Sequence, residues 1–212
     1  MNSYEKLIKE MIDNQEQTLN MYEELKEELR IRKCVFEGEP FKLALVPLIL
    51  KKKDIDLLTY VSEILYKIIN KIIMASSCDN NMEPYFSYKD IPAEWISVDK
   101  GYKEHAVITR LDALYDGKNL KFLEFNTDNP GGKGWNDIFE EIVLCHGAYR
   151  ELFPSGISLH RKSVVDGLFK AVMKSSLDFW GPGEKPSVAI IDYRESRFLG
   201  DGEIVKDYFL SQ

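Results

Sequence analysis

The chain has 212 residues, of which 44% are hydrophobic and 12% aromatic, so it has enough apolar surface to fold around a packed core. Its formal net charge of −7 argues against a general attraction to nucleic acids or anionic membranes, and we expect neither as a partner. The three cysteines are widely spaced and odd in number, which indicates neither a disulfide framework nor a cysteine-rich zinc site. The N-terminus is charged, and no apolar run resembles a signal peptide or reaches membrane-spanning length, so the sequence predicts a cytoplasmic protein.

The first part of the chain has the apolar period of helices. Between Tyr4 and Leu29 apolar residues recur every three or four positions among charged ones, which predicts an amphipathic helix. Packing on the core of the same chain is the favoured role of its apolar stripe, and a seam for a partner helix is the alternative. A second, well-buried helix is predicted to begin near Asp54, whose side chain can cap free amides, and to continue through Ile72. A passage rich in loops then leads to Lys100.

Two strand-like runs follow, at Ala106 to Tyr115 and at Leu120 to Asn126. The turn-forming sequence Asp116-Gly117-Lys118-Asn119 joins them, so the sequence predicts a β-hairpin. A three-residue loop, with Asn119 in the left-handed conformation, would set the register of the two strands. A two-residue loop would place the polar side chains of the two strands on opposite faces.

The rest of the chain is predicted to alternate between helix and strand. Helical patterns run from about Asp137 to Tyr149, from Arg161 to Phe179 and from Glu203 to the end, and the apolar run Ser187 to Asp192 is typical of a buried parallel strand. We therefore expect an α/β (α+β) fold, with residues 1–180 holding the helices and the hairpin. Residues 186–212 would begin a second α/β unit. Because a lone strand and helix cannot cover their own sheet edges, we expect the sequence to be the N-terminal portion of a longer protein.

Four polar residues lie where strand patterning otherwise requires an apolar face. Alternation places Arg110 and Asp112 on one side of the first strand, and Glu124 and Asn126 on one side of the second. With the three-residue loop, Asp112 pairs with Glu124 and Arg110 with Asn126, so all four side chains share one face. An all-oxygen set of Asp112, Glu124 and Asn126 suits Mg²⁺, and the planar donor fork of Arg110 suits a phosphate or an oxyanion. The alternative is a surface hairpin with a charged face, in which Arg110 pairs with a carboxylate and no metal binds.

The passage ITRLDALYDGKNLKFLEFNTDNPGG, residues 108–132, resembles the metal-binding strands of ATP-grasp ligases. In that family an Arg-x-Asp strand, a short turn, a Glu-x-Asn strand and a Pro-Gly loop hold magnesium against the phosphates of ATP. FLEFNTDNPGG also resembles the circularly permuted branch of the family, the glutathionylspermidine synthase-like proteins. The resemblance implies that Asp112, Glu124 and Asn126 are magnesium ligands that contact bound ATP, and that Arg110 is a catalytic, nucleotide-contacting residue that steadies an acyl phosphate.

The resemblance implies an enzyme that uses ATP and Mg²⁺ to join a small-molecule carboxylate to an amine through an acyl phosphate, forming a C–N bond. We expect the 212 residues by themselves to be inactive, because a nucleotide clamp is not evident in them. A non-catalytic binding or scaffold protein with a degenerate ATP-grasp-like site is the principal alternative, and a phosphotransferase with the same metal site is another.

Other polar residues are weaker candidates for a site. The three histidines His105, His146 and His160 lack the spacing of metal ligands. Arg194 and Arg197 follow the predicted strand at a position that is common for ligand contacts, although a charged surface loop is the favoured interpretation.

Overall fold

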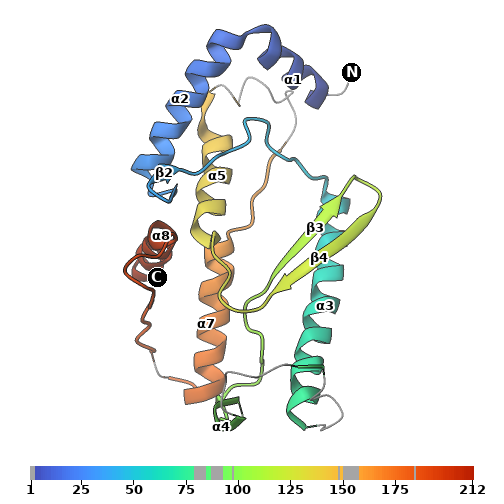
Figure 1. Ribbon diagram of the computed structural model, residues 1–212, viewed down its shortest axis with the longest axis vertical. Helices are drawn as coiled ribbons and strands as arrows, with labels where there is room; N and C mark the ends of the chain where they lie inside the picture. The colour runs from blue at the N-terminus through green and yellow to red at the C-terminus, as the bar shows by residue number, and fades with distance from the viewer. Residues whose placement is uncertain are drawn as a thin grey trace. The chain divides into compact units, whose positions relative to one another are not determined.

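The computed structural model describes residues 3–78, 85–86, 93–96, 98–147, 149, 158–183 and 185–212. These residues form helices and two small antiparallel sheets, which confirms the predicted mixture of helix and strand as an α+β arrangement (Figure 1). The chain divides into two compact units. Unit 1 comprises Met1–Ile49, Gly131–Gly167 and Val188–Gln212, and unit 2 comprises Leu50–Pro130 and Leu168–Ser187. None of the described helices is both long enough and apolar enough to cross a membrane.

Unit 1 begins with two helices in place of the single predicted one. Helix α1 (Ser3–Asp13) and helix α2 (Gln15–Ile31) cover the predicted range and are separated at Asn14. The Asn14 side-chain amide donates to the Glu10 carbonyl at 3.0 Å, and the Thr18 hydroxyl donates to the Met11 carbonyl at 2.9 Å. The Glu10 carbonyl also accepts from the backbone nitrogen of Asn14 at 3.0 Å, so it keeps its helical partner, and the Thr18 bond links α2 back to the end of α1 across the break.

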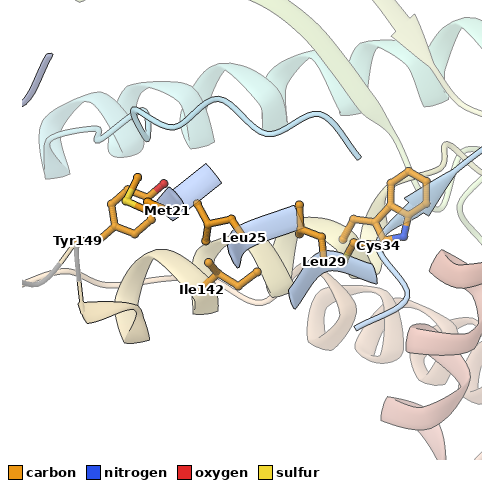
Figure 2. Packing of buried hydrophobic residues seen from close by; sticks show 7 residues of the cluster. Met21, Leu25, Leu29, Cys34, Ile142 and Tyr149 are labelled. Carbon is orange, nitrogen blue, oxygen red and sulfur yellow. The ribbon is translucent and has the colours of Figure 1, made fainter. Parts of the chain in front are cut away.

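The core of unit 1 lies between α2 and helix α5 (Lys133–Cys145). Figure 2 shows Leu25 and Leu29 of α2 beside Ile142 of α5, with Cys34 and Tyr149 at the two ends of the cluster. The Tyr149 hydroxyl donates to the Leu45 carbonyl at 2.8 Å, so its polar end is satisfied although the side chain is buried. Strands β1 (Val35–Phe36) and β2 (Glu39–Pro40) pair in a short hairpin after α2.

A buried carboxylate of α5 caps the next helix, α7 (Val164–Trp180). Asp137 accepts hydrogen bonds from the backbone nitrogens of Val164 and Val165 at 2.7 and 3.2 Å, and from the Ser163 hydroxyl. Ser163 also accepts from the backbone nitrogen of Asp166 at 3.0 Å, as a local N-cap does. The predicted helix from Arg161 to Phe179 is therefore confirmed, with its start fixed three residues later by these caps.

The predicted strand from Ser187 to Asp192 is wrong. Residues 185–193 form no strand with any other described part of the chain, and Val188, Ile190 and Ile191 are 46%, 47% and 87% exposed. An apolar run becomes a strand only where a neighbour pairs with its backbone groups, and the described residues offer it none. The helix predicted after it is confirmed as α8 (Leu199–Leu210).

Unit 2 is built on the 27-residue helix α3 (Lys52–Cys78), which confirms the second predicted helix. The predicted burial of this helix is wrong, because its described side chains are all half-buried or exposed. Asp54 lies in its first turn and accepts a hydrogen bond from the backbone nitrogen of Lys51 at 3.2 Å. Asp54 is the third residue of the helix, and its carboxylate binds the backbone nitrogen of the cap residue Lys51, as the acidic residue of a capping box does. Most of the predicted loop passage before Lys100 lies outside the described residues, and within it α4 (Ala93–Ile96) forms one helical turn.

Candidate functional site

The β-hairpin of unit 2 consists of β3 (Arg110–Tyr115) and β4 (Leu120–Asn126), which confirms the predicted hairpin (Figure 1). Its turn end is joined to α3, because the Tyr115 hydroxyl donates to Asp54 Oδ1 at 2.7 Å. This bond lowers the pKa of Asp54 and raises the pKa of Tyr115. The first turn of α3 therefore holds one end of the hairpin in place.

A second attachment to α3 explains why β3 begins at Arg110 and not at Ala106. The side-chain oxygen of Asn70 accepts from the backbone nitrogens of His105 and Ala106 at 2.7 and 2.9 Å, and its nitrogen donates to the Ala106 carbonyl at 3.4 Å. The backbone of these two residues is thus bound to a helix side chain. Pairing with β4 can begin only after it, and the first pair is Arg110 with Asn126.

The register places the four predicted site residues opposite one another. Arg110 pairs with Asn126 and Asp112 pairs with Glu124. Directly opposed residues of an antiparallel pair project from the same face, and residues two apart on one strand do so as well. Arg110, Asp112, Glu124 and Asn126 therefore share one face, as the sequence predicts, and we call these four side chains the polar quartet.

The turn that produces this register differs from the predicted one. Tyr115 pairs with Leu120, so the loop contains the four residues Asp116 to Asn119 and not three. A four-residue loop alone would shift the pairing by one residue. A β-bulge corrects the shift, because Ala113 pairs with Phe122 while Asp112 pairs with Glu124, and Leu123 is the extra residue.

The bulge also keeps the aromatic side chains of β4 away from the polar quartet. In an unbroken strand Phe122 would share a face with Glu124 and Asn126, because the three positions alternate by two. With Leu123 inserted, Phe122 lies on the same face as Phe125, and the two rings stack with centroids 6.1 Å apart. The hairpin therefore has one face with the quartet and an opposite face with these aromatic rings.

The four side chains of the quartet form one contact within each strand. Arg110 Nε lies 3.1 Å from Asp112 Oδ1, and Asn126 Nδ2 donates to Glu124 Oε1 at 3.1 Å. The side chains of Arg110 and Asp112 are 49% and 36% exposed, so the pair is open to solvent and to a ligand. Each carboxylate has a second oxygen, and Asn126 has its amide oxygen. This gives a hard, all-oxygen donor set of the kind that magnesium prefers.

The quartet does not by itself complete a metal coordination shell. Across the described residues, no group of three or more His, Cys, Asp or Glu side chains is arranged to hold a metal ion. Two carboxylates and an amide fit a cation that takes its remaining ligands from water and phosphate, as Mg²⁺ commonly does in nucleotide sites. The donor set is therefore suited to a metal that arrives with a phosphate ligand.

The glycine-rich sequence after the hairpin is bound to another part of unit 1. Backbone nitrogens of Gly132, Lys133, Gly134 and Trp135 donate to the Asp201 carboxylate at 2.9, 3.2, 2.6 and 3.3 Å. Burial lowers the pKa of Lys133, although the charge of Asp201 opposes that shift. The Asp201 carboxylate thus caps the start of α5, which begins at Lys133, four residues before its predicted start. Sequence reasoning missed Asp201, because no local pattern connects it to a helix 67 residues earlier.

The weaker candidates do not gather into a site. His146 lies 3.7 Å from Glu24, and His160 contacts the Ser158 hydroxyl at 3.0 Å. Arg197 forms an ion pair with Glu37 at 2.8 Å. These residues make separate contacts near the surface, as the favoured interpretations of the sequence predict.

Comparisons of the chain with protein-family models, with curated proteins and with solved structures found no significant match. The chemistry and geometry of the polar quartet, together with the sequence resemblance that its residues carry, are therefore the basis for inferring a function.

Proposed function

We propose that the polar quartet binds Mg²⁺ together with the phosphates of ATP, as one wall of an ATP-grasp-like site. The protein would then take part in ATP-dependent ligation of a carboxylate to an amine. The observation that carries the proposal is the pairing of Asp112 with Glu124 in a register that also brings Arg110 opposite Asn126. The sequence resemblance to ATP-grasp ligases involves the same four residues.

The opposed carboxylates of Asp112 and Glu124 are the feature that a bound cation would stabilise. Asp112 and Glu124 face each other across the strands, and like charges in that position destabilise a sheet by repulsion. A bound Mg²⁺ offsets the repulsion and supplies positive charge for phosphate oxygens. Asn126 adds a neutral oxygen donor beside Glu124, within the same strand face.

Arg110 has the chemistry to bind the reacting group. Its guanidinium carries donors in a rigid fork, which can bridge two oxygens of a phosphoryl group or of an acyl phosphate. In the structure it contacts Asp112 through Nε. A cation held by Asp112 would compete for this carboxylate, so the guanidinium would become available to hold the phosphoryl oxygens and to stabilise the negative charge that develops when a nucleophile attacks.

One observation favours the scaffold alternative. The Arg110–Asp112 contact at 3.1 Å neutralises one carboxylate without any metal, as an inert surface hairpin would. Exposed pairs of this kind contribute little to stability, about 0–1 kcal/mol, so the contact does not explain why four polar residues share a strand face. Binding of a cation at the hairpin is the property that separates the two functions.

The experiment uses Mn²⁺ as a paramagnetic stand-in for Mg²⁺ and follows the backbone amide resonances of the isotope-labelled chain, with and without ATP. Bound Mn²⁺ is expected to broaden the resonances of residues 110–112 and 124–126 first, more strongly when ATP is present. Glu124→Gln removes one ligand charge with little change of volume. It is expected to abolish the broadening and to leave the melting temperature unchanged.

Glu16→Gln is the matched control, because Glu16 is an exposed carboxylate on α2 and outside the quartet. It is expected to bind Mn²⁺ like the wild type. Absence of selective broadening at the hairpin, with and without ATP, would reject the metal site and favour the scaffold function.

A further inference from the structure

Helix α3 carries a row of apolar side chains exposed to solvent. Leu57, Tyr60, Ile64, Ile68 and Ile72 follow one another at intervals of three and then four residues, so they form a ridge along one face of the helix. Their exposed fractions lie between 37% and 64%. A continuous apolar ridge of this kind is typical of a surface that another element covers. We call these five side chains the α3 ridge.

The segment before the hairpin is held on the opposite face of α3. Tyr66 hydrogen-bonds to Glu104, and Asn70 binds the backbone of His105 and Ala106. Tyr66 follows Ile64 by two residues, so it projects about 200° away around the helix. The ridge is therefore not the face that holds the segment before the hairpin. Asp54, which binds Tyr115 of the hairpin, lies one turn before Leu57 and so beyond the N-terminal end of the ridge.

The ridge is close to symmetric about Ile64. Tyr60 and Ile68 lie four residues before and after it, and Leu57 and Ile72 lie seven before and eight after. A second copy of α3 running antiparallel across the first would set Ile64 against itself, Tyr60 against Ile68 and Leu57 against Ile72. Such a contact is isologous, because each copy offers the same surface, and rows at intervals of four pack well into each other.

The charges beside the ridge have a matching arrangement. Asp56 and Glu63 lie toward its N-terminal end, Lys67 and Lys71 lie toward its C-terminal end, and the helical period puts all four on the same side. An antiparallel copy brings Glu63 near Lys67 of the second copy and Asp56 near Lys71 of the second copy. A parallel copy would bring each of the four charges near its own equivalent, whereas in the antiparallel pair only Glu63 also lies near its own equivalent. Opposed charges of this kind select the direction of helix pairing.

We propose that α3 mediates self-association of the chain as an antiparallel helix pair centred on Ile64. The occupant of the ridge is a second copy of this chain, because the apolar row and its flanking charges are both complementary to themselves when reversed. A single helix crossing buries less than the roughly 1,200 Å² of a standard stable interface, so the dimer is weak and reversible. We expect association in the micromolar range.

Sedimentation velocity of the full chain from about 1 to 200 µM tests the proposal. The wild type is expected to shift from monomer to dimer over this range. Ile64→Lys places two like charges at the symmetry axis, and the variant is expected to stay monomeric with at least about a tenfold weaker association. Leu19→Lys is the matched control, since Leu19 is 60% exposed on α2, and this variant is expected to associate like the wild type.

Charge reversal tests the direction of pairing. Glu63→Lys and Lys67→Glu are each expected to weaken the dimer, and the double variant is expected to restore it, because the opposed charges are exchanged together. Circular dichroism and melting temperature of every variant show whether α3 remains folded. A wild type that stays monomeric, or an Ile64→Lys chain that still dimerises, overturns the proposal. A monomeric wild type that Ile64→Lys destabilises would show that the chain itself covers the ridge.

Discussion

The Asp201 carboxylate in α8 lies 2.6 Å from the backbone nitrogen of Gly134 in the first turn of α5. The same carboxylate accepts from the nitrogens of Gly132, Lys133 and Trp135, and Asp201 is only 3% exposed. The start of a helix leaves its first amides without helical partners, and here one buried side chain supplies acceptors for four of them. The bond network joins the start of α5 to α8 within unit 1.

Asp201→Ala is expected to lower the free energy of unfolding by roughly 3 kcal/mol, because a lost helix cap costs about 0.5–2 kcal/mol and buried amides without an acceptor add to that cost. Asp201→Asn keeps one acceptor oxygen and is expected to lose less. Urea unfolding followed by circular dichroism measures both variants. If Asp201→Ala unfolds within about 0.5 kcal/mol of the wild type, the carboxylate contributes no more than an ordinary surface residue.

A second prediction follows from the close approach of α8 to the backbone just after the end of α2. A Cβ added at Gly200 would overlap the backbone carbonyl oxygen of Lys33, which cannot move aside as a flexible side chain could. Gly200→Ala is therefore expected to destabilise the chain by about 1–3 kcal/mol, as overpacking does. Gly202 is the control, because its added Cβ would meet only Ile190 Cγ2 at 3.6 Å, an ordinary contact.

Gly202→Ala is expected to stabilise α8 by about 0.5–1 kcal/mol, because alanine loses less conformational freedom than glycine in a helix. Thermal melting of the two variants beside the wild type gives the comparison. Shifts of the same sign for both positions would contradict the close approach at Gly200.

The spacing of apolar residues predicted the helices, because apolar side chains that recur every three or four positions lie on one face of a helix. The spacing of apolar residues gave α3 within a few residues of its observed bounds, and it gave the range of α1 and α2 without the break at Asn14. The side-chain hydrogen bonds at the break, from Asn14 to Glu10 and from Thr18 to Met11, leave no trace in hydrophobic spacing.

The register of the hairpin was predicted correctly although its turn was not. The sequence predicts a three-residue loop, whereas the structure combines a four-residue loop with a bulge at Leu123, and the two differences cancel at Asp112 and Glu124. The polar face itself was the stronger signal. A register that separated the quartet would also have placed Phe125 on the same face as Arg110 and Asp112.

Long-range contacts account for what the sequence did not predict. The start of α5 depends on Asp201, which is distant in sequence, and the start of α7 depends on Asp137. The apolar run from Ser187 to Asp192 has the composition of a buried strand, but a strand also requires a neighbour, and composition does not say whether one is present.

Cys34 is expected to resist thiol reagents in the native protein. Its side chain is buried in the core of unit 1, and burial raises the pKa of its thiol to about 12, although the charge of Arg32 opposes that shift. Because the thiolate is the reacting form, modification near pH 8 is expected to be at least about 100-fold slower than at Cys145, which is exposed. Mass spectrometry of the labelled peptides measures the two rates separately. Similar rates at both residues under native conditions would show that the core around Cys34 opens readily.

The turn that sets the register of the polar quartet is expected to make a pH-dependent contribution to stability. Asp116 accepts from the backbone nitrogens of Asn119 and Lys118 at 2.7 and 2.8 Å, and from the Asn119 side chain at 2.9 Å. These bonds, led by the Asn119 backbone bond, lower the pKa of Asp116 to about 2, whereas an unfolded aspartate titrates near about 3.9. The folded state therefore holds the charged form more tightly than the unfolded state does.

The sign of the effect follows from that difference. Stabilisation by Asp116 is fully present above about pH 4 and is lost as the pH falls through about 2. Asp116→Asn removes this titration, so the stability difference between wild type and variant is expected to be constant near neutral pH and to shrink between about pH 4 and pH 2. Hydrogen exchange of the β3 and β4 amides as a function of pH measures it at the hairpin itself. An Asp116 carboxyl carbon that titrates near pH 4 by NMR would show that the turn does not hold the charged form, and that the apolar faces of the strands set the register without it.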